Sequence, residues 1–351
     1  MAPAGRGRSG HDARDVAGVH PRRPAGGEAA VSAPAVERPA PPRAEEKRPT
    51  RGRRSERSRA EARLGWMLAG PAFVLMLLVT MYPILQAFFD SLFSLRLTAP
   101  DEREFIWFRN YAVVLGDPAF WQSMGVTLFI TVVTVILELI LGFLLALVMH
   151  RAVKKLRGFA RTAILVPYGI VTVVAAFAWF YAFDINSGYI NSWLAWVPGF
   201  DEDFNWFAYQ GSSLFVIILS EVWKTTPFIS LLLLSGLAQV PGDLEEAAKV
   251  DGATGWEVMR RVILPNMKAA IMVAVLFRTL EAFRIFDNIY IMTAGANDTE
   301  ALSLLAYNTS IGRLEIGLGS AISVLLFLSV LIIAGIFIKG FRVDLAGGRN
   351  S

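Results

Sequence analysis

The most informative stretch of this chain, residues 241–268, reads PGDLEEAAKVDGATGWEVMRRVILPNMK and lies between two long apolar runs. The Pro241–Gly242 pair ends the preceding helix, after which Asp243 can cap a new one. Glu246, three residues further on, can complete a capping box. The pattern therefore predicts a short amphipathic helix at Leu244–Val250.

The second half of the same stretch predicts another helix. Gly252 can adopt the left-handed backbone conformation that ends the first one. An amphipathic piece follows from Trp256 to Leu264, and Pro265 suits the start of the next helix. Residues 241–268 are therefore predicted to form a helix–glycine–helix hairpin that lies under a membrane, with an apolar face available for docking.

Long apolar segments flank this hairpin on both sides. Of the 351 residues, 54 % are hydrophobic and 18 % are charged, whereas soluble domains carry about 25 % charged residues. Each segment is long enough to cross a hydrocarbon core, which needs about 20 residues of helix. The predicted fold class is an all-α integral membrane protein with six transmembrane helices, the cytoplasmic hairpin and a disordered N-terminal tail. The six predicted spans are Leu64–Phe89, Phe120–Met149, Thr162–Phe183, Ser212–Val240, Ala269–Ala294 and Ile316–Ile338.

Residues 1–63 are predicted to be a disordered, basic, cytoplasmic tail, because they contain eight prolines and no Phe, Trp or Tyr. The arginines of this tail either contact anionic lipid headgroups or only help to set orientation. With the N-terminus inside, the predicted inner segments hold 27 Lys and Arg and the outer loops hold 4. This asymmetry predicts a multi-pass protein of the cell membrane with both termini in the cytoplasm. The other predicted domains are a membrane domain at 64–342 and a short cytoplasmic tail at 343–351.

The sequence lacks the residues that several kinds of functional site require. The chain has no cysteine, which excludes disulfides and thiolate chemistry. Two of its three histidines, His11 and His20, lie in the tail, and His150 is far from both in sequence. No Gly-x-x-x-x-Gly-Lys-Ser/Thr run is present to bind nucleotide phosphates. The chain is therefore predicted to be no enzyme, with no catalytic residue, no metal site and no nucleic-acid partner.

The fourth predicted span places four side chains on one helix face. Pro227 removes a backbone hydrogen bond there, which predicts a local kink or opened turn whose freed groups line a cavity. Carboxylates can bond sugar hydroxyls and aromatic rings can cover apolar ring faces, so this face suits a sugar. The alternative is an internal Glu221–Lys224 pair that only ties helices together. The side chains of this face are Glu221, Lys224, Thr225 and Phe228.

The fifth predicted span carries charges of alternating sign. Such a ladder can satisfy itself in a low-dielectric setting, so Arg278 and Glu281 can be structural. Asp287 and Asn288 lie nearer the outer half and are candidates for a sugar site. Glu138 is the single charge of the second span, where an interhelical hydrogen bond is favoured over a part in transport. The ladder consists of Arg278, Glu281, Arg284 and Asp287.

Residues 246–265, EAAKVDGATGWEVMRRVILP, resemble the cytoplasmic loop of the membrane subunits of ABC importers, in particular of the sugar-importing branch. The shared pattern is Glu-Ala-Ala-x-x-Asp-Gly-Ala followed by Leu-Pro. The resemblance implies a coupling helix that is seated in a cleft of an ATPase subunit and passes ATP-driven closure to the membrane helices. The alternative is an ordinary amphipathic connector. The residues expected to face the ATPase are Glu245, Glu246, Ala247, Ala248, Asp251, Gly252 and Ala253.

Further stretches, among them EVWKTTPF at 221–228 and RTLEAFRIFDNIY at 278–290, resemble permease subunits of the trehalose-importer type. The resemblance implies half of a pathway for a sugar, trehalose or a related α-glucoside. It implies no cofactor on this chain, since ATP and Mg would bind partner ATPase subunits. The implied partners are a second homologous permease subunit, an ATPase dimer, an extracytoplasmic solute-binding lipoprotein, the sugar and the lipid bilayer. The substrate-pathway candidates are Glu221, Lys224, Thr225, Phe228, Asp287 and Asn288.

Two other functions stay open on the residues alone. A membrane-embedded glycosyl or lipid transferase would use the charged ladder of the fifth span as its acid–base or metal-binding groups. A stand-alone secondary transporter would carry an internal repeat that relates two halves, and the sequence shows none.

Overall fold

The computed structural model describes residues 56–99, 101–151 and 157–340. The predicted tails therefore lie largely outside the described residues, although helix already begins at Glu56, inside the segment predicted to be disordered. Within the described residues all regular structure is helical, apart from one isolated β-bridge between Phe93 and Phe105. The elements are α1 Glu56–Asp90, α2 Arg109–Gly116, α3 Pro118–Arg151, α4 Arg157–Gly169, α5 Thr172–Phe183, α6 Ile190–Leu194, α7 Gln210–Leu237, α8 Gly242–Val250, α9 Gly255–Val258, η1 Met259–Ile263, α10 Leu264–Asn266, α11 Lys268–Ala282, α12 Asp287–Met292, α13 Leu302–Tyr307, η2 Asn308–Gly312 and α14 Ile316–Gly340, of which η1 and η2 are π-helical.

Four helices of the described residues, α1, α3, α7 and α14, are long and apolar enough to cross a membrane. The number rises to six if each of two bent pairs is one span: α4 with α5, bent by 91°, and the hairpin arm 255–266 with α11, bent by 69°. The predicted span Thr162–Phe183 is therefore not one continuous helix but the bent pair α4 and α5. Its two pieces meet just after Pro167 and Gly169, residues that weaken helix continuation.

The predicted helix Ala269–Ala294 is also interrupted. α11 ends at Ala282 and α12 starts only at Asp287, after a residue, Phe286, whose φ of −138° and ψ of −61° are not helical. Because of this break, the four charged residues of the predicted ladder do not lie on one helix. Arg278 and Glu281 lie on α11, Arg284 lies in the connection, and Asp287 begins α12.

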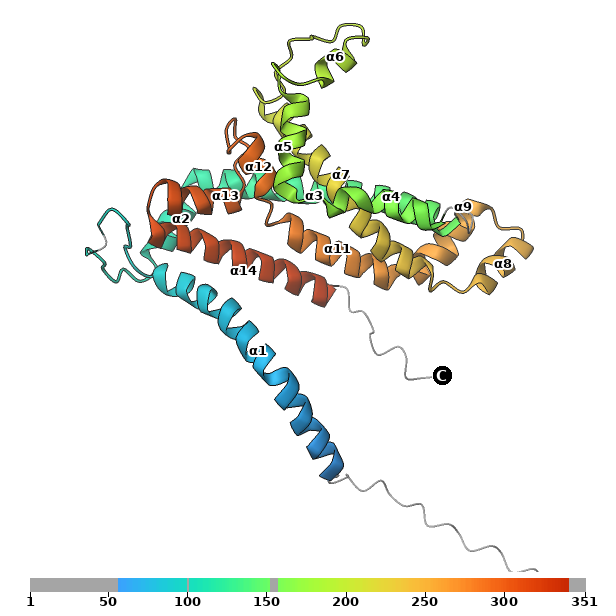
Figure 1. Ribbon diagram of the computed structural model, residues 1–351, viewed down its shortest axis with the longest axis horizontal. Coiled ribbons are helices and arrows are strands. Elements are labelled where there is room, and N and C mark those ends of the chain that lie inside the picture. The colour runs from blue at the N-terminus through green and yellow to red at the C-terminus, as the bar shows by residue number, and fades with distance from the viewer. Residues whose placement is uncertain (1–55, 100, 152–156, 341–351) are drawn as a thin grey trace, which may run out of the picture. The chain divides into compact units, whose positions relative to one another are not determined.

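Helices α3, α7, α11 and α14 run side by side, with α11 antiparallel to the other three (Figure 1). The contact between α3 and α7 is the most extensive of the fold. It is close because Gly142 leaves room: a methyl carbon added there would lie 2.9 Å from Ile229 Cγ2 and 3.3 Å from the Ser230 nitrogen. A second close approach joins Gly236 of α7 to Ala270 of α11.

The connections collect at two ends of this bundle. The hairpin α8–α10 lies at the end where α3 and α7 finish and α4 and α11 begin (Figure 1). The loop with α6 and the short helices α2, α12 and α13 lie away from that end (Figure 1). The end of α3, the start of α4 and the hairpin therefore share one end of the bundle.

Candidate functional site

The hairpin predicted from residues 241–268 is present. α8 ends at Val250, and Gly252 has a φ of +80°, which glycine adopts at low cost. The second arm starts at Gly255 and continues through the π-helical turn into α10, which ends at Asn266. The prediction of a glycine turn between two short helices is confirmed.

The predicted capping box of Asp243 and Glu246 is wrong. Gly242 is already helical, so the N-cap of α8 is Pro241, which makes no side-chain capping hydrogen bond, and Asp243 lies inside the first turn. The capping box forms one helix later, at Thr254 and Glu257. The Glu257 nitrogen donates to Thr254 Oγ1 over 3.3 Å, and the Thr254 nitrogen donates to Glu257 Oε2 over 2.9 Å.

The two arms of the hairpin differ in burial. The second arm is anchored, because Val258 and Ile263 are buried in an apolar cluster that includes Leu233 and Leu237 of α7. No residue of α8 is buried, and Val250 is 86 % exposed. The residues predicted to face an ATPase are all on α8 or in the turn after it, and none of them is buried: Glu245, Glu246, Ala247, Ala248, Asp251, Gly252 and Ala253.

A buried cluster of charged residues joins α3, α7 and α11. Arg278 is 1 % exposed, and its Nε and Nη2 donate to both oxygens of Glu138, which is fully buried. Arg278 Nη2 also donates to Glu221 Oε1 over 2.8 Å. Thr225 Oγ1 donates to Glu138 Oε1 over 2.6 Å, and Asn288 Nδ2 donates to Glu221 Oε2 over 2.5 Å. One guanidinium thus holds two carboxylates of different helices.

This cluster confirms one expectation for the charged residues and corrects another. The interhelical hydrogen bond expected of Glu138 is present. The ladder of the fifth span is not self-contained: Arg278 Nη1 lies 3.3 Å from Glu281, but its hydrogen bonds go to α3 and α7. Arg284 Nε donates to the Leu280 carbonyl instead.

The alternative prediction, an internal ion pair between Glu221 and Lys224, is wrong for the described side chains. The ion pair recorded for Glu221 is with Arg278, and Lys224 Nζ lies over the ring of Tyr168, 5.8 Å from its centroid. Tyr168 of α4 also stacks on Phe228, with centroids 5.3 Å apart. Lys224 and Phe228 are half-buried, so a cation and two aromatic rings form a second, less enclosed group.

The substrate-pathway candidates therefore divide into two sets. Glu221, Thr225 and Asn288 belong to the buried charge cluster, whereas Lys224 and Phe228 belong to the Tyr168 group. Asp287 is half-buried at the first position of α12. Of the kink or opened turn predicted at Pro227, the opened turn is absent, since α7 is helical without a break from Gln210 to Leu237.

Two buried polar atoms among the described residues have no hydrogen-bond partner: Arg278 Nη1 and Asn288 Oδ1. Both residues bond the same carboxylate, that of Glu221. Sequence reasoning missed Tyr168 as a site residue, because no spacing rule relates it to a helix that starts 42 positions later, at Gln210. No cluster of three or more His, Cys, Asp or Glu that could hold a metal occurs in the described ranges.

Helices long and apolar enough to cross a membrane, an exposed hairpin at one end and a buried charge cluster indicate an integral membrane protein. Residues 138–342, which include the hairpin and the cluster, match the family model of the binding-protein-dependent transport system inner membrane component, and the chain belongs to this family. The resemblance to the membrane subunits of ABC importers is thereby confirmed.

Two relatives extend the match over most of the chain. The trehalose transport system permease protein SugA of Mycobacterium tuberculosis is 50 % identical over 292 residues, 83 % of this chain and 93 % of the relative. The trehalose/maltose transport system permease protein MalF of Thermococcus litoralis is 38 % identical over 81 % of this chain and 96 % of the relative. Among solved structures, a chain of a bacterial alginate ABC transporter in complex with an alginate-bound periplasmic protein has the same fold, with a TM-score of 0.70 and 19 % identity over 82 % of this chain and 97 % of that chain.

Proposed function

We propose that this chain forms half of the translocation pathway of an ABC importer for trehalose or a related α-glucoside. The observation that carries the substrate class is the 50 % identity to a protein named as a trehalose permease, over 93 % of that protein. ATP hydrolysis resides on partner subunits, where ATP and Mg bind, and this chain carries no cofactor. Its remaining partners are a second permease subunit and an extracytoplasmic solute-binding protein.

The hairpin is the proposed point of contact with the ATPase. Its first arm, α8, has no buried residue and meets the apolar cluster only through half-buried Ala248, while the second arm is packed on the bundle. The second arm continues into α11 across the bend at Met267. A displacement of α8 is therefore transmitted through the second arm to α11. α11 carries Arg278, which holds Glu138 and Glu221. Movement of the hairpin is therefore passed to α3 and α7 through buried ion pairs.

We place the sugar on the side of Tyr168, Lys224 and Phe228. A half-buried cation with two aromatic rings supplies hydrogen-bond donors and an apolar surface for a sugar ring. Asp287 adds a half-buried carboxylate at the start of α12. Nucleotide binding favours an outward-open state, and a ligand shifts this balance only through different affinities for the two states.

The chain is a multi-pass membrane protein, and we propose that both termini are cytoplasmic. This orientation places the hairpin, at the end of the bundle where α3 finishes and α4 begins, on the side of the ATPase. The aromatic and acidic loop around α6 then lies outside, where the solute-binding protein arrives.

Gly252→Trp tests the docking role of the hairpin. Nothing lies within 4 Å of a Cβ placed at Gly252, so the bulky ring projects from the exposed turn toward the ATPase. With the assembled importer in proteoliposomes, ATP hydrolysis is expected to continue while trehalose uptake is lost. Gly199→Trp is the matched control, because Gly199 also has positive φ and open surroundings but lies in the loop after α6.

The control is expected to keep hydrolysis and uptake coupled. Coupled uptake by the Gly252→Trp importer would contradict the docking role. Purification of the chain from its own cells without an ATPase subunit would contradict the proposed function as a whole.

A further inference from the structure

The buried charge cluster lies between two apolar clusters of the described residues. Along α3, Glu138 is flanked by Ile130 of one apolar cluster and by Ala146 of the other. α7 repeats this order around Glu221. Both helices are continuous there and run side by side, so the charged side chains form a polar layer between two apolar ones (Figure 1).

The two apolar clusters contain different elements, and we name them by their position relative to the hairpin. The hairpin-side layer includes Val258 and Ile263 of the second arm, Ala274 of α11 and the second halves of α3 and α7. The distal layer includes Ala182 of α5, Ile289 of α12 and the first halves of α3 and α7. The hairpin therefore belongs to one layer, whereas α5 and α12 belong to the other.

The backbone is weakened at several points where the chain passes from one layer to the other. α4 and α5 meet at a bend of 91°, and α11 and α12 are separated by the break at Phe286. Within α7, Pro227 has no N–H to donate to the Trp223 carbonyl. These connections resist bending less than an unbroken helix does. Side-chain contacts are therefore needed to hold the two layers in a fixed relation.

One carboxylate bonds both sides of the break at Phe286. Arg278 of α11 donates to Glu221 Oε1 over 2.8 Å, and Asn288 of α12 donates to Glu221 Oε2 over 2.5 Å. The same guanidinium holds Glu138 of α3. Hydrogen bonds that involve a charged group are stronger than neutral ones, and loss of one partner of a buried bond is costly. The Glu221 carboxylate thus ties α12 to α11 where the backbone between them is not helical.

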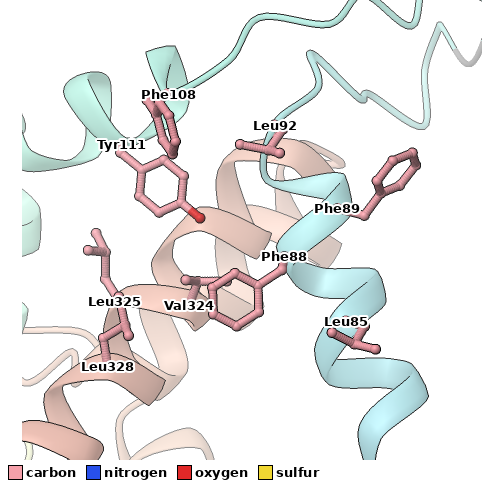
Figure 2. Close-up of a pocket in the computed structure, with 9 residues that line it drawn as sticks. All are labelled: Leu85, Phe88, Phe89, Leu92, Phe108, Tyr111, Val324, Leu325 and Leu328. Atoms are coloured by element: carbon pink, nitrogen blue, oxygen red, sulfur yellow. The ribbon is translucent and has the colours of Figure 1, made fainter.

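The end of α1 provides a hydrogen bond that does not cross the layers. Figure 2 shows Phe88 of α1 and Tyr111 of α2 pointing toward one another across an apolar cavity of about 520 Å³. The Tyr111 hydroxyl shares a hydrogen bond of 2.7 Å with Ser91 Oγ, and Ser91 Oγ also donates to the Phe88 carbonyl. None of these three residues belongs to either layer. Loss of this bond therefore serves as a control for loss of the bond between Glu221 and Asn288.

We propose that Glu221 and Asn288 are positioning residues that brace the distal layer against the hairpin-side layer. The proposal rests on the proposed function, in which an ATPase moves the hairpin. With the brace intact, the two layers turn as one body, and α5 and α12 follow the hairpin although the backbone that leads to them is bent or broken. Without the brace, the hairpin-side layer moves and the distal layer does not follow.

The distance between the layers tests the brace directly. The sequence contains no cysteine, so spin labels can be attached at Asn186→Cys and Gln239→Cys. Asn186 lies in a turn held by Asp184, next to the distal layer, and Gln239 follows the end of α7 in the hairpin-side layer. Pulsed electron paramagnetic resonance is applied to the assembled importer without sugar, with partner subunits free of cysteine. We expect one narrow distance that stays the same when a non-hydrolysable ATP analogue binds.

Asn288→Leu keeps the approximate size of the side chain but cannot donate to Glu221. It also removes Asn288 Oδ1, a buried atom without a hydrogen-bond partner among the described residues. The variant is expected to lose the single distance and to give a broader distribution that shifts when the analogue binds. Uptake per ATP hydrolysed is expected to fall about tenfold, the effect of one buried hydrogen bond to a charged group. Asn288→Ala serves if leucine prevents assembly.

An exchange of the two side-chain groups is expected to restore the brace. In the double variant Glu221→Gln with Asn288→Asp, the amide lies on α7 and the carboxylate on α12. The amide can still donate across the layers, while its oxygen accepts from Arg278. The narrow distance and most of the coupled uptake are expected to return. Tyr111→Phe is the control and is expected to change neither, because it removes only the bond to Ser91.

A narrow, unchanged distance in the Asn288→Leu importer would overturn the proposal. A distance between the layers that shifts with nucleotide in the otherwise natural chain would overturn it too, as would equal broadening in Tyr111→Phe. Absence of ATP-driven trehalose uptake by the importer with the natural chain would contradict the proposed function instead. The distances measured without nucleotide would still test the brace in that case, because they depend only on how firmly the two layers are held together.

Discussion

Arg278 is the centre of the buried charge cluster, because its guanidinium donates to both Glu138 and Glu221. A buried guanidinium is tolerated only where carboxylates meet it with good geometry. Glu138 does so through both oxygens and receives a further hydrogen bond from Thr225. Glu281 also lies near the guanidinium, but its side chain is 51 % exposed. Glu138 and Glu281 should therefore differ greatly in their contribution to the free energy of unfolding.

Glu138→Ala is expected to lower the free energy of unfolding by about 3 kcal/mol, because it leaves Arg278 buried without its bidentate partner. Glu281→Ala is the matched control and is expected to cost less than about 1 kcal/mol, as for an exposed ion pair. Thermal unfolding of the purified assembly measures both. Similar losses in the two variants would contradict the larger contribution assigned to the buried Glu138–Arg278 pair.

At the scale of elements, the pairing of α3 with α7 organises the bundle. The two helices approach closely where a glycine replaces a side chain, as is common in membrane helix interfaces. The glycine is Gly142, which faces Ile229 and the backbone of Ser230. Gly125 of the same helix has nothing within 4 Å of the corresponding position.

Gly142→Leu is expected to destabilise the fold by about 2 kcal/mol, because the new side chain would force α3 and α7 apart. Gly125→Leu should leave the melting temperature close to that of the unsubstituted chain. The comparison uses thermal unfolding of the purified assembly. An unchanged melting temperature for Gly142→Leu would indicate that this interface adjusts at no cost.

For the whole molecule, the orientation in the membrane decides which surfaces meet which partners. The sequence contains no cysteine, so a single introduced thiol reports its own location. Asn186→Cys lies in the exposed loop after α5, and Gln239→Cys lies just beyond α7, next to the hairpin.

A membrane-impermeant maleimide is expected to label Asn186→Cys in intact cells and Gln239→Cys only after the membrane is permeabilised. Segment 239–268 holds four Lys and Arg and residues 184–211 hold none, and loops that carry Lys and Arg remain inside. The natural cysteine-free chain is the control for background labelling. The reverse pattern would invert the proposed orientation and would remove the hairpin from the reach of an ATPase.

The features that the sequence determined by itself are local. The glycine turn at Gly252, the two short helices around it and the long apolar runs each depend on neighbouring residues, so spacing and composition suffice to predict them. The capping box was predicted at α8, but it forms at the start of α9. Both Asp243 and Thr254 are suitable N-cap residues, and the sequence does not reveal that Gly242, before Asp243, is already helical.

Only the tertiary structure decided which polar groups meet inside the bundle. Arg278 bonds Glu138 across 140 positions, and Asn288 bonds Glu221 across 67. The bend after α4, which sends α5 off at 91°, likewise could not be read from apolar length. Periodicity assigns a residue to a face of its own helix, but it holds no information on which other helix packs there. That choice follows from close packing of all helices together, which is why the buried charge cluster and the stacking of Tyr168 on Phe228 appear only in the folded chain.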